Sequence, residues 1–170
     1  YQFYPYDSVW GPMHWGHAKS KDLLHWEELP VALAPSESYD KDGCFSGSAI
    51  VKDDKLYLLY TGHVDDEEKR EETQCLAVST DGITFEKLPT NPVIHAQHIE
   101  GIADIADFRD PKVFEYQGRY YAVVASKTPD DRGQILLFVS SNLVDWDFTS
   151  VLLEGEKGQG IMWECPDFFP

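Results

Sequence analysis

The sequence predicts an all-β fold built from repeated units of about four strands. Three observations predict it: a segment that recurs about every sixty residues, short apolar runs separated by turn residues, and a near absence of helical patterns. Aromatic residues make up 14% of the chain, and many of them fall in the strand-like runs, where β propensity favours them. Hydrophobic residues make up 42%, which is enough to build a packed core.

The recurring segment begins with serine and carries an aromatic residue near its end. Its three copies occupy residues 20–29, 79–88 and 141–148. Their aromatic residues, Trp26, Phe85 and Trp146, stand 59 and 61 residues apart. A second pair of similar segments, 54–60 and 117–124, precedes the last two copies, and a further apolar run follows each of them. Turn residues such as Gly118 separate these runs, so each unit is expected to contain four strands.

Four strands and a recurring aromatic residue are typical of a β-propeller blade, which covers its apolar faces by stacking on its neighbours. The chain has 170 residues and therefore fewer than three such units, whereas a propeller closes with about 4–8 blades. The sequence thus predicts an incomplete ring that belongs to a longer protein. A small β-sandwich with a chance repeat is the alternative. The acidic run 65–72 is interpreted as a solvated loop rather than a helical turn.

Composition excludes several classes of function. The net charge of −16 argues against binding to nucleic acid or to an anionic membrane. No stretch of about 18 apolar residues is present, so no membrane span is predicted. The cysteines, Cys44, Cys75 and Cys165, are few and widely spaced and form no CxxC motif. We therefore expect a protein of a reducing compartment, the cytoplasm, with no disulfide scaffold and no zinc site.

Two acidic residues stand out by their context. Asp110 lies in an Arg-Asp-Pro segment and Glu164 in a Trp-Glu-Cys-Pro segment. A proline and then apolar residues follow each acid, so each is expected to begin an innermost strand. The two acids are 54 residues apart, about one blade, so adjacent blades can present both to one pocket. Two carboxyl groups in a pocket with aromatic residues indicate glycoside hydrolysis.

The sequence neighbours of these acids suggest opposite effects on their pKa values. Arg109 favours the ionised form of Asp110, as a charge stabiliser requires. Trp163 is expected to desolvate Glu164 and raise its pKa, as a general acid requires. Neighbours along a strand point to opposite faces, so both pairings are hypotheses. The segment 43–49 is either a tight entry into a strand at the pocket or an ordinary turn of small residues.

Five segments of the chain resemble glycoside hydrolase family 32, with its bacterial sucrose-6-phosphate hydrolases and invertases as the nearest group. The segments are 10–17, 20–26, 45–48, 108–111 and 163–167. The resemblance implies a five-bladed β-propeller, usually followed by a C-terminal β-sandwich. It also implies hydrolysis of terminal β-D-fructofuranosyl bonds with retention, in sucrose or sucrose 6-phosphate, without metal or cofactor. The implied partner is a small sugar.

The same resemblance assigns roles to residues of this chain. Glu164 matches the family's general acid/base, and Asp110 matches the residue that stabilises the transition state through fructosyl hydroxyl groups, with Arg109 beside it. The positions that match the lining of the fructose subsite are Trp10, Phe45 and Ser46.

The chain departs from the family pattern at two points. The family's nucleophile is an aspartate in a Trp-Met-Asn-Asp-Pro-Asn-Gly motif, which residues 1–170 do not contain. We expect that motif upstream, so that 1–170 is a partial catalytic propeller and is inactive alone. Pro5 stands where the family commonly has a substrate-binding glutamine, which is expected to weaken fructose binding or shift specificity. The alternatives are a catalytically dead carbohydrate-binding propeller and a related five-bladed glycosidase acting on arabinose or xylose chains.

Overall fold

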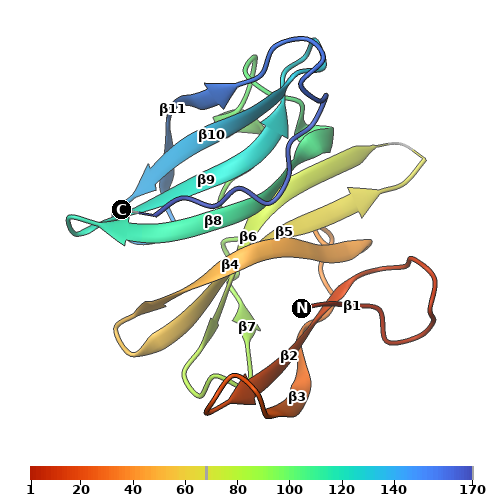
Figure 1. Cartoon of the computed structure of the whole chain (residues 1–170), viewed down its shortest axis with the longest axis vertical. Coiled ribbons are helices and arrows are strands. Elements are labelled where there is room, and N and C mark those ends of the chain that lie inside the picture. Colours follow the sequence, from red (N-terminus) through yellow and green to blue (C-terminus); the bar gives the residue numbers. More distant parts are fainter. Residues whose placement is uncertain (68, 170) are drawn as a thin grey trace.

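The fold is described by a computed structural model that covers residues 1–67 and 69–169. Three antiparallel sheets form in these residues: β1-β2-β3, β4-β5-β6-β7 and β8-β9-β10-β11 (Figure 1). The strands are β1 (Gln2–Phe3), β2 (His14–Ser20), β3 (Trp26–Leu33), β4 (Gly43–Lys52), β5 (Lys55–Asp65), β6 (Arg70–Ser79), β7 (Glu86–Lys87), β8 (Phe108–Tyr116), β9 (Arg119–Lys127), β10 (Gly133–Ser140) and β11 (Trp146–Glu154). Two single turns of 3-10 helix, η1 (Ala96–His98) and η2 (Ile105–Asp107), are far too short to cross a membrane.

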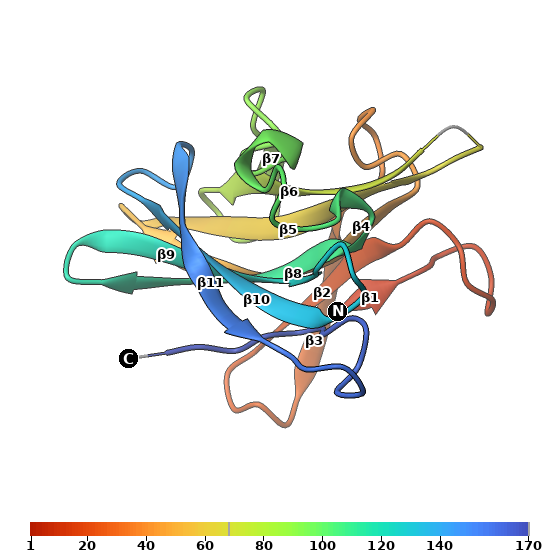
Figure 2. The same ribbon diagram turned by 90° about the horizontal axis from the view of Figure 1, so that it is seen from above.

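The all-β prediction is confirmed, and the three successive sheets fit an incomplete propeller. Strands follow chain order across each sheet, so each four-stranded unit is a simple meander. The sheets of β4–β7 and β8–β11 pack face to face, with β5 and β6 lying over β8 and β10 when the molecule is seen from above (Figure 2). The innermost strands β4 and β8 lie side by side, where Ser48 Oγ donates to the Pro111 carbonyl and accepts the Val113 N–H, both at 2.8 Å.

The hydrophobic core lies between the sheets. The larger cluster joins the second and third sheets and includes Leu59, Leu76, Phe108 and Phe138, all fully buried. The smaller cluster joins the first and second sheets. Because the middle sheet is covered on both faces, β5 and β6 are buried at successive positions rather than at alternate ones. Each large side chain buried there contributes about 1.5–3 kcal/mol to stability.

The three copies of the repeated segment form the same loop, which leads into the outermost strand of each sheet. In every copy one side-chain oxygen accepts two backbone N–H groups, and the next residue is left-handed. These pairs are Asp22 with Leu23, Asp81 with Gly82, and Asn142 with Leu143. Burial nevertheless differs between copies, since Trp146 is 5% exposed and Trp26 is 56% exposed. Local hydrogen bonds therefore fix the loop, while its burial depends on what packs against it.

One extra residue interrupts β4 and β8 at equivalent points. In β4 the register shifts between Phe45 and Gly47, which places Ser46 in a β-bulge. In β8 it shifts between Arg109 and Lys112, so the bulge contains Asp110, whose φ is 60°. Such bulges re-aim side chains and are common beside active sites.

The predicted placement of the acids near the start of innermost strands is confirmed for Asp110 and wrong for Glu164. Asp110 is the third residue of the innermost strand β8, whereas Glu164 lies in no strand. The segment around Glu164 runs beside β8 (Figure 1) and is held by side chains instead of by a backbone ladder. Lys112 pairs with Asp167 at 3.0 Å, and the rings of Phe114 and Phe168 are 5.4 Å apart. Without ladder hydrogen bonds the segment does not become a strand.

The acidic run 65–72 is only in part the solvated loop that the sequence predicted, since residues 66, 67 and 69 lie in an exposed loop and the flanking residues lie in strands. Asp65 ends β5 and Arg70 begins β6, so most of the run belongs to a hairpin; Glu68 lies outside the described residues. Glu72 is completely buried. A carboxylate is tolerated there because basic and backbone donors surround it.

Asp40 is a second buried carboxylate, and its loss is expected to destabilise the chain. It accepts hydrogen bonds from Tyr60 Oη at 2.8 Å, from Lys87 Nζ at 2.5 Å and from two backbone N–H groups. We expect Asp40→Ala to lower the free energy of unfolding by about 3–5 kcal/mol, because Lys87 loses its buried partner. Urea unfolding measures the change. Glu27→Ala, which breaks an exposed pair with Lys19, is the control and should change little; equal losses in both variants would contradict the prediction.

Candidate active site

Asp110 lies in the bulge of β8 and is 7% exposed. Its backbone N–H donates to Thr61 Oγ1 at 3.0 Å. Its Oδ2 accepts the Cys165 N–H at 2.9 Å and the Cys165 thiol at 3.5 Å. Burial raises the pKa of Asp110 above its ordinary value; the Cys165 hydrogen bonds and the Arg109 charge oppose that rise but do not cancel it. The Arg109 charge thus favours ionised Asp110, as expected from the sequence, but burial outweighs it and the net pKa shift is upward.

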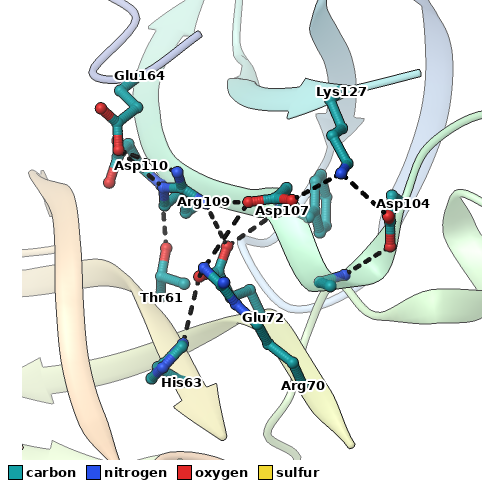
Figure 3. Close-up of polar contacts among 12 residues, drawn as sticks. Thr61, His63, Arg70, Glu72, Asp104, Asp107, Arg109, Asp110, Lys127 and Glu164 are labelled. Carbon is teal, nitrogen blue, oxygen red and sulfur yellow. Dashed lines mark hydrogen bonds and ion pairs between the residues drawn. The ribbon is translucent and has the colours of Figure 1, made fainter. Parts of the chain in front are cut away.

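Arg109 turns its guanidinium toward other carboxylates (Figure 3). Nη1 donates to Glu72 Oε2 and to Asp107 Oδ1, both at 3.0 Å. Nε and Nη2 donate to Glu164 Oε1 at 3.1 and 3.0 Å. Burial lowers the pKa of Arg109, but the three carboxylates raise it by more, so the guanidinium stays charged.

The structure brings Asp110, Arg109 and Glu164 together. Arg109 binds Glu164 directly, and Cys165, the next residue, binds Asp110. The side chain of Glu164 remains 61% exposed. Its carboxyl group therefore faces solvent while its orientation is fixed by a bidentate pair of N–H donors on one oxygen.

Trp163 does not cover Glu164, contrary to the expectation from the sequence. Its indole Nε1 donates to the Gln159 carbonyl at 3.0 Å, and its ring packs on Gly133 and Gly155. A Cβ at Gly133 would lie 2.5 Å from the ring, so only glycine permits this approach. Trp163 thus anchors the segment before Glu164 instead of desolvating the acid.

Two of the three residues expected at the fructose subsite meet in the structure. The ring of Phe45 stacks on His63, with centroids 4.0 Å apart and an interplanar angle of 15°. Trp10 is 76% exposed in the loop between β1 and β2 and meets Phe45 edge-on at 5.8 Å. Ser46 is half-buried in the bulge of β4. Pro5 is exposed in the same loop as Trp10.

Sequence reasoning missed Glu72 and His63, which the structure places at the centre of the site. Glu72 Oε2 also accepts the Phe108 N–H at 3.0 Å, and Glu72 Oε1 lies 3.2 Å from His63 Nδ1. The only signal for Glu72 was its position at the end of an acidic run that enters an apolar strand. In residues 1–67 and 69–169, no three His, Cys, Asp or Glu side chains come together as metal ligands would.

Comparison with known proteins identifies the family to which this chain belongs. The whole chain, residues 1–170, matches the N-terminal domain of the glycosyl hydrolases family 32. A sucrose-6-phosphate hydrolase of Zymomonas mobilis is 46% identical over 99% of this chain, and one of Escherichia coli is 48% identical over 99%. In both cases the match spans 35% of the relative's length.

Solved structures agree with this assignment. The β-fructofuranosidase of Bombyx mori, of which a mutant was solved in complex with sucrose, has a TM-score of 0.89 and 48% identity over 100% of this chain and 35% of its own. Fructan 1-exohydrolase IIa of Cichorium intybus has a TM-score of 0.85 and 32% identity over 98% of this chain and 31% of its own. A family 43 enzyme of Xanthomonas citri shares the fold alone, at 17% identity and a TM-score of 0.52. The resemblance found in the sequence is thus confirmed, and the chain belongs to glycosyl hydrolases family 32.

Proposed function

We propose that this chain is the N-terminal, site-bearing part of a retaining β-fructofuranosidase that hydrolyses the terminal fructosyl bond of sucrose or sucrose 6-phosphate. The similarity to sucrose-6-phosphate hydrolases supports the reaction class. The observation that carries the proposal is that Arg109 holds the exposed Glu164 beside the buried Asp110. Two carboxyl groups in such different surroundings suit the two roles that glycoside hydrolysis needs.

In the proposed reaction Glu164 protonates the leaving glucosyl oxygen and then removes a proton from the water that releases fructose. Its solvent exposure allows both transfers. Asp110 binds fructosyl hydroxyl groups more strongly as positive charge develops on the sugar ring. Retention also requires a nucleophilic carboxylate. We assign that role to an aspartate outside residues 1–170, and the chain to a partial five-bladed catalytic propeller.

The aromatic cluster supports a sugar subsite. Trp10 is exposed in the loop that carries Pro5, and its ring meets the half-buried ring of Phe45 edge-on. Aromatic rings bury the apolar face of a sugar, while Ser46 supplies a hydroxyl group for hydrogen bonding. We propose that these three residues line the fructose subsite.

Incubation of the full-length protein with sucrose and with sucrose 6-phosphate tests the function. We expect release of fructose, with methyl β-D-fructofuranoside as the first product in methanol, because retention delivers the acceptor to the original face. The 170-residue chain alone is expected to release no reducing sugar. Sugar binding without hydrolysis would favour the carbohydrate-binding propeller, and release of arabinose or xylose would favour the related glycosidase.

A further inference from the structure

One buried carboxylate contacts both halves of the candidate site. Glu72 extends from β6 into the space between the second and third sheets and is inaccessible to solvent. Its Oε2 accepts the Phe108 N–H and an N–H of Arg109, each at 3.0 Å. Its Oε1 lies 3.2 Å from His63 Nδ1 and 3.7 Å from Arg70 Nη2. Figure 3 shows these groups converging on Glu72 from β5, β6 and β8.

Each partner of Glu72 leads to a different functional element. On one side, Arg109 uses its remaining N–H donors, Nε and Nη2, to hold Glu164. On the other side, the His63 ring stacks on Phe45, one of the residues proposed for the fructose subsite. A continuous series of contacts therefore connects the proton donor to the sugar-binding aromatic residues, and Glu72 is its middle member.

We propose that Glu72 is a positioning residue, which fixes Arg109 toward Glu164 and His63 beneath Phe45 and so holds the proton donor and the fructose subsite in one geometry. This inference rests on the proposed function. A buried carboxylate is costly without a cationic partner, so Arg109 cannot turn away from Glu72 without leaving an uncompensated charge. Arg109 is thereby confined to the orientation in which only Nε and Nη2 remain for Glu164.

The charge of Glu72 also affects the proton affinity of Glu164. The groups that face Glu72 are His63, Arg70 and Arg109. Arg109 also faces Asp107, which is itself paired with Lys127 at 3.1 Å. Removing the charge of Glu72 leaves the positive charge of Arg109 less compensated, which strengthens the attraction between Arg109 and the Glu164 carboxylate. Asp110 and Cys165, the other titratable neighbours of Glu164, are unchanged by that substitution.

Glu72→Gln in the full-length protein tests the proposal, because glutamine keeps the size and one acceptor but loses the charge. The alkaline limb of kcat/KM reports the ionisation of the general acid. We expect this limb to move down by about one pH unit, the size of effect that loss of one nearby charge produces at a partly buried site. We also expect KM to rise several-fold as the aromatic half of the site loosens.

Two controls separate positioning from structural support. Glu71→Gln makes the same charge change one residue away, where the side chain pairs with Lys69 in solvent, and should leave the profile unchanged. Asp40→Asn removes a buried carboxylate that contacts Tyr60 and Lys87, and should lower stability without moving the alkaline limb. A Glu72→Gln variant that is less stable but has an unshifted limb would overturn the proposal.

A second variant and a direct titration allow the proposal to be tested even if the protein does not hydrolyse sucrose. Asp107→Asn removes the other carboxylate that contacts Arg109 Nη1. It should move the alkaline limb of kcat/KM in the same direction as Glu72→Gln does, but by a smaller amount. NMR can follow the chemical shift of the Glu164 carboxyl carbon against pH in the full-length protein, whether or not sucrose is hydrolysed. The signal is assigned by its absence from the spectrum of Glu164→Gln. A lowered Glu164 pKa in Glu72→Gln supports the proposal even if the proposed function fails; an unchanged pKa refutes it.

Discussion

Replacing Glu164 with glutamine is expected to lower kcat/KM for sucrose by about 10²–10⁴-fold, the range that general acid–base catalysis contributes. Glutamine can still accept the N–H groups of Arg109 through its carbonyl oxygen, so the segment should keep its place beside β8. What the variant loses is the proton for the leaving glucosyl oxygen and the base for water. The steady-state rate of fructose release measures the effect.

Comparing substrates with different leaving groups distinguishes loss of acid catalysis from distortion of the active site. A fructosyl donor whose leaving group needs no proton, such as fructosyl fluoride, should be cleaved by Glu164→Gln far better than sucrose is, and added azide should capture the fructosyl group because no base is needed. Glu154→Gln serves as the control, since Glu154 pairs with Arg132 on the third sheet. A Glu164→Gln variant within tenfold of the parent on sucrose would rule out the assigned role.

The fold was predictable because residues close together in sequence determine the loop that is repeated in each unit. A serine, an Asp or Asn two residues later and an aromatic residue encode the same loop three times, and short-range hydrogen bonds form it without help from the rest of the chain. Burial was not predictable from the same pattern. Leu143 is buried because the segment around η1 packs over the third sheet, whereas Leu23 has no such cover.

The sequence predicted which acidic residues lie together in the candidate site, but it did not predict how their surroundings shift their pKa values. Asp110 and Glu164 could be paired from their spacing. The direction of the Asp110 pKa shift could not be predicted, because it depends on how deeply the bulge of β8 buries that carboxyl group. Glu72 is 37 residues from Arg109 in sequence, on another sheet, so its burial depends on a contact that no local pattern encodes. For the same reason the sequence favoured a solvated loop there.

Asp110→Asn is expected to abolish most activity and yet stabilise the folded protein near neutral pH. Burial raises the Asp110 pKa above 3.8 in the folded chain, so the folded state binds the proton more tightly than the unfolded state does. The stability contribution of the protonated acid is therefore complete below about pH 4, the unfolded value, and is lost as pH rises through the raised pKa. Asparagine does not ionise, so the variant keeps this stability contribution as the pH rises.

Urea unfolding of both proteins between pH 3 and 8, together with sucrose hydrolysis, measures this trade-off. The difference in unfolding free energy should favour Asp110→Asn increasingly as pH rises, and become constant below about pH 4. Asparagine can still accept the Cys165 N–H through its carbonyl oxygen, so the local fold should persist. Activity should fall by about 10²–10³-fold, because a neutral amide stabilises developing positive charge poorly. A variant that loses activity but shows a pH-independent stability difference would mean that Asp110 is ionised at no cost in the folded chain. In that case burial of this carboxylate would not be the stability cost of a catalytic group that the prediction requires.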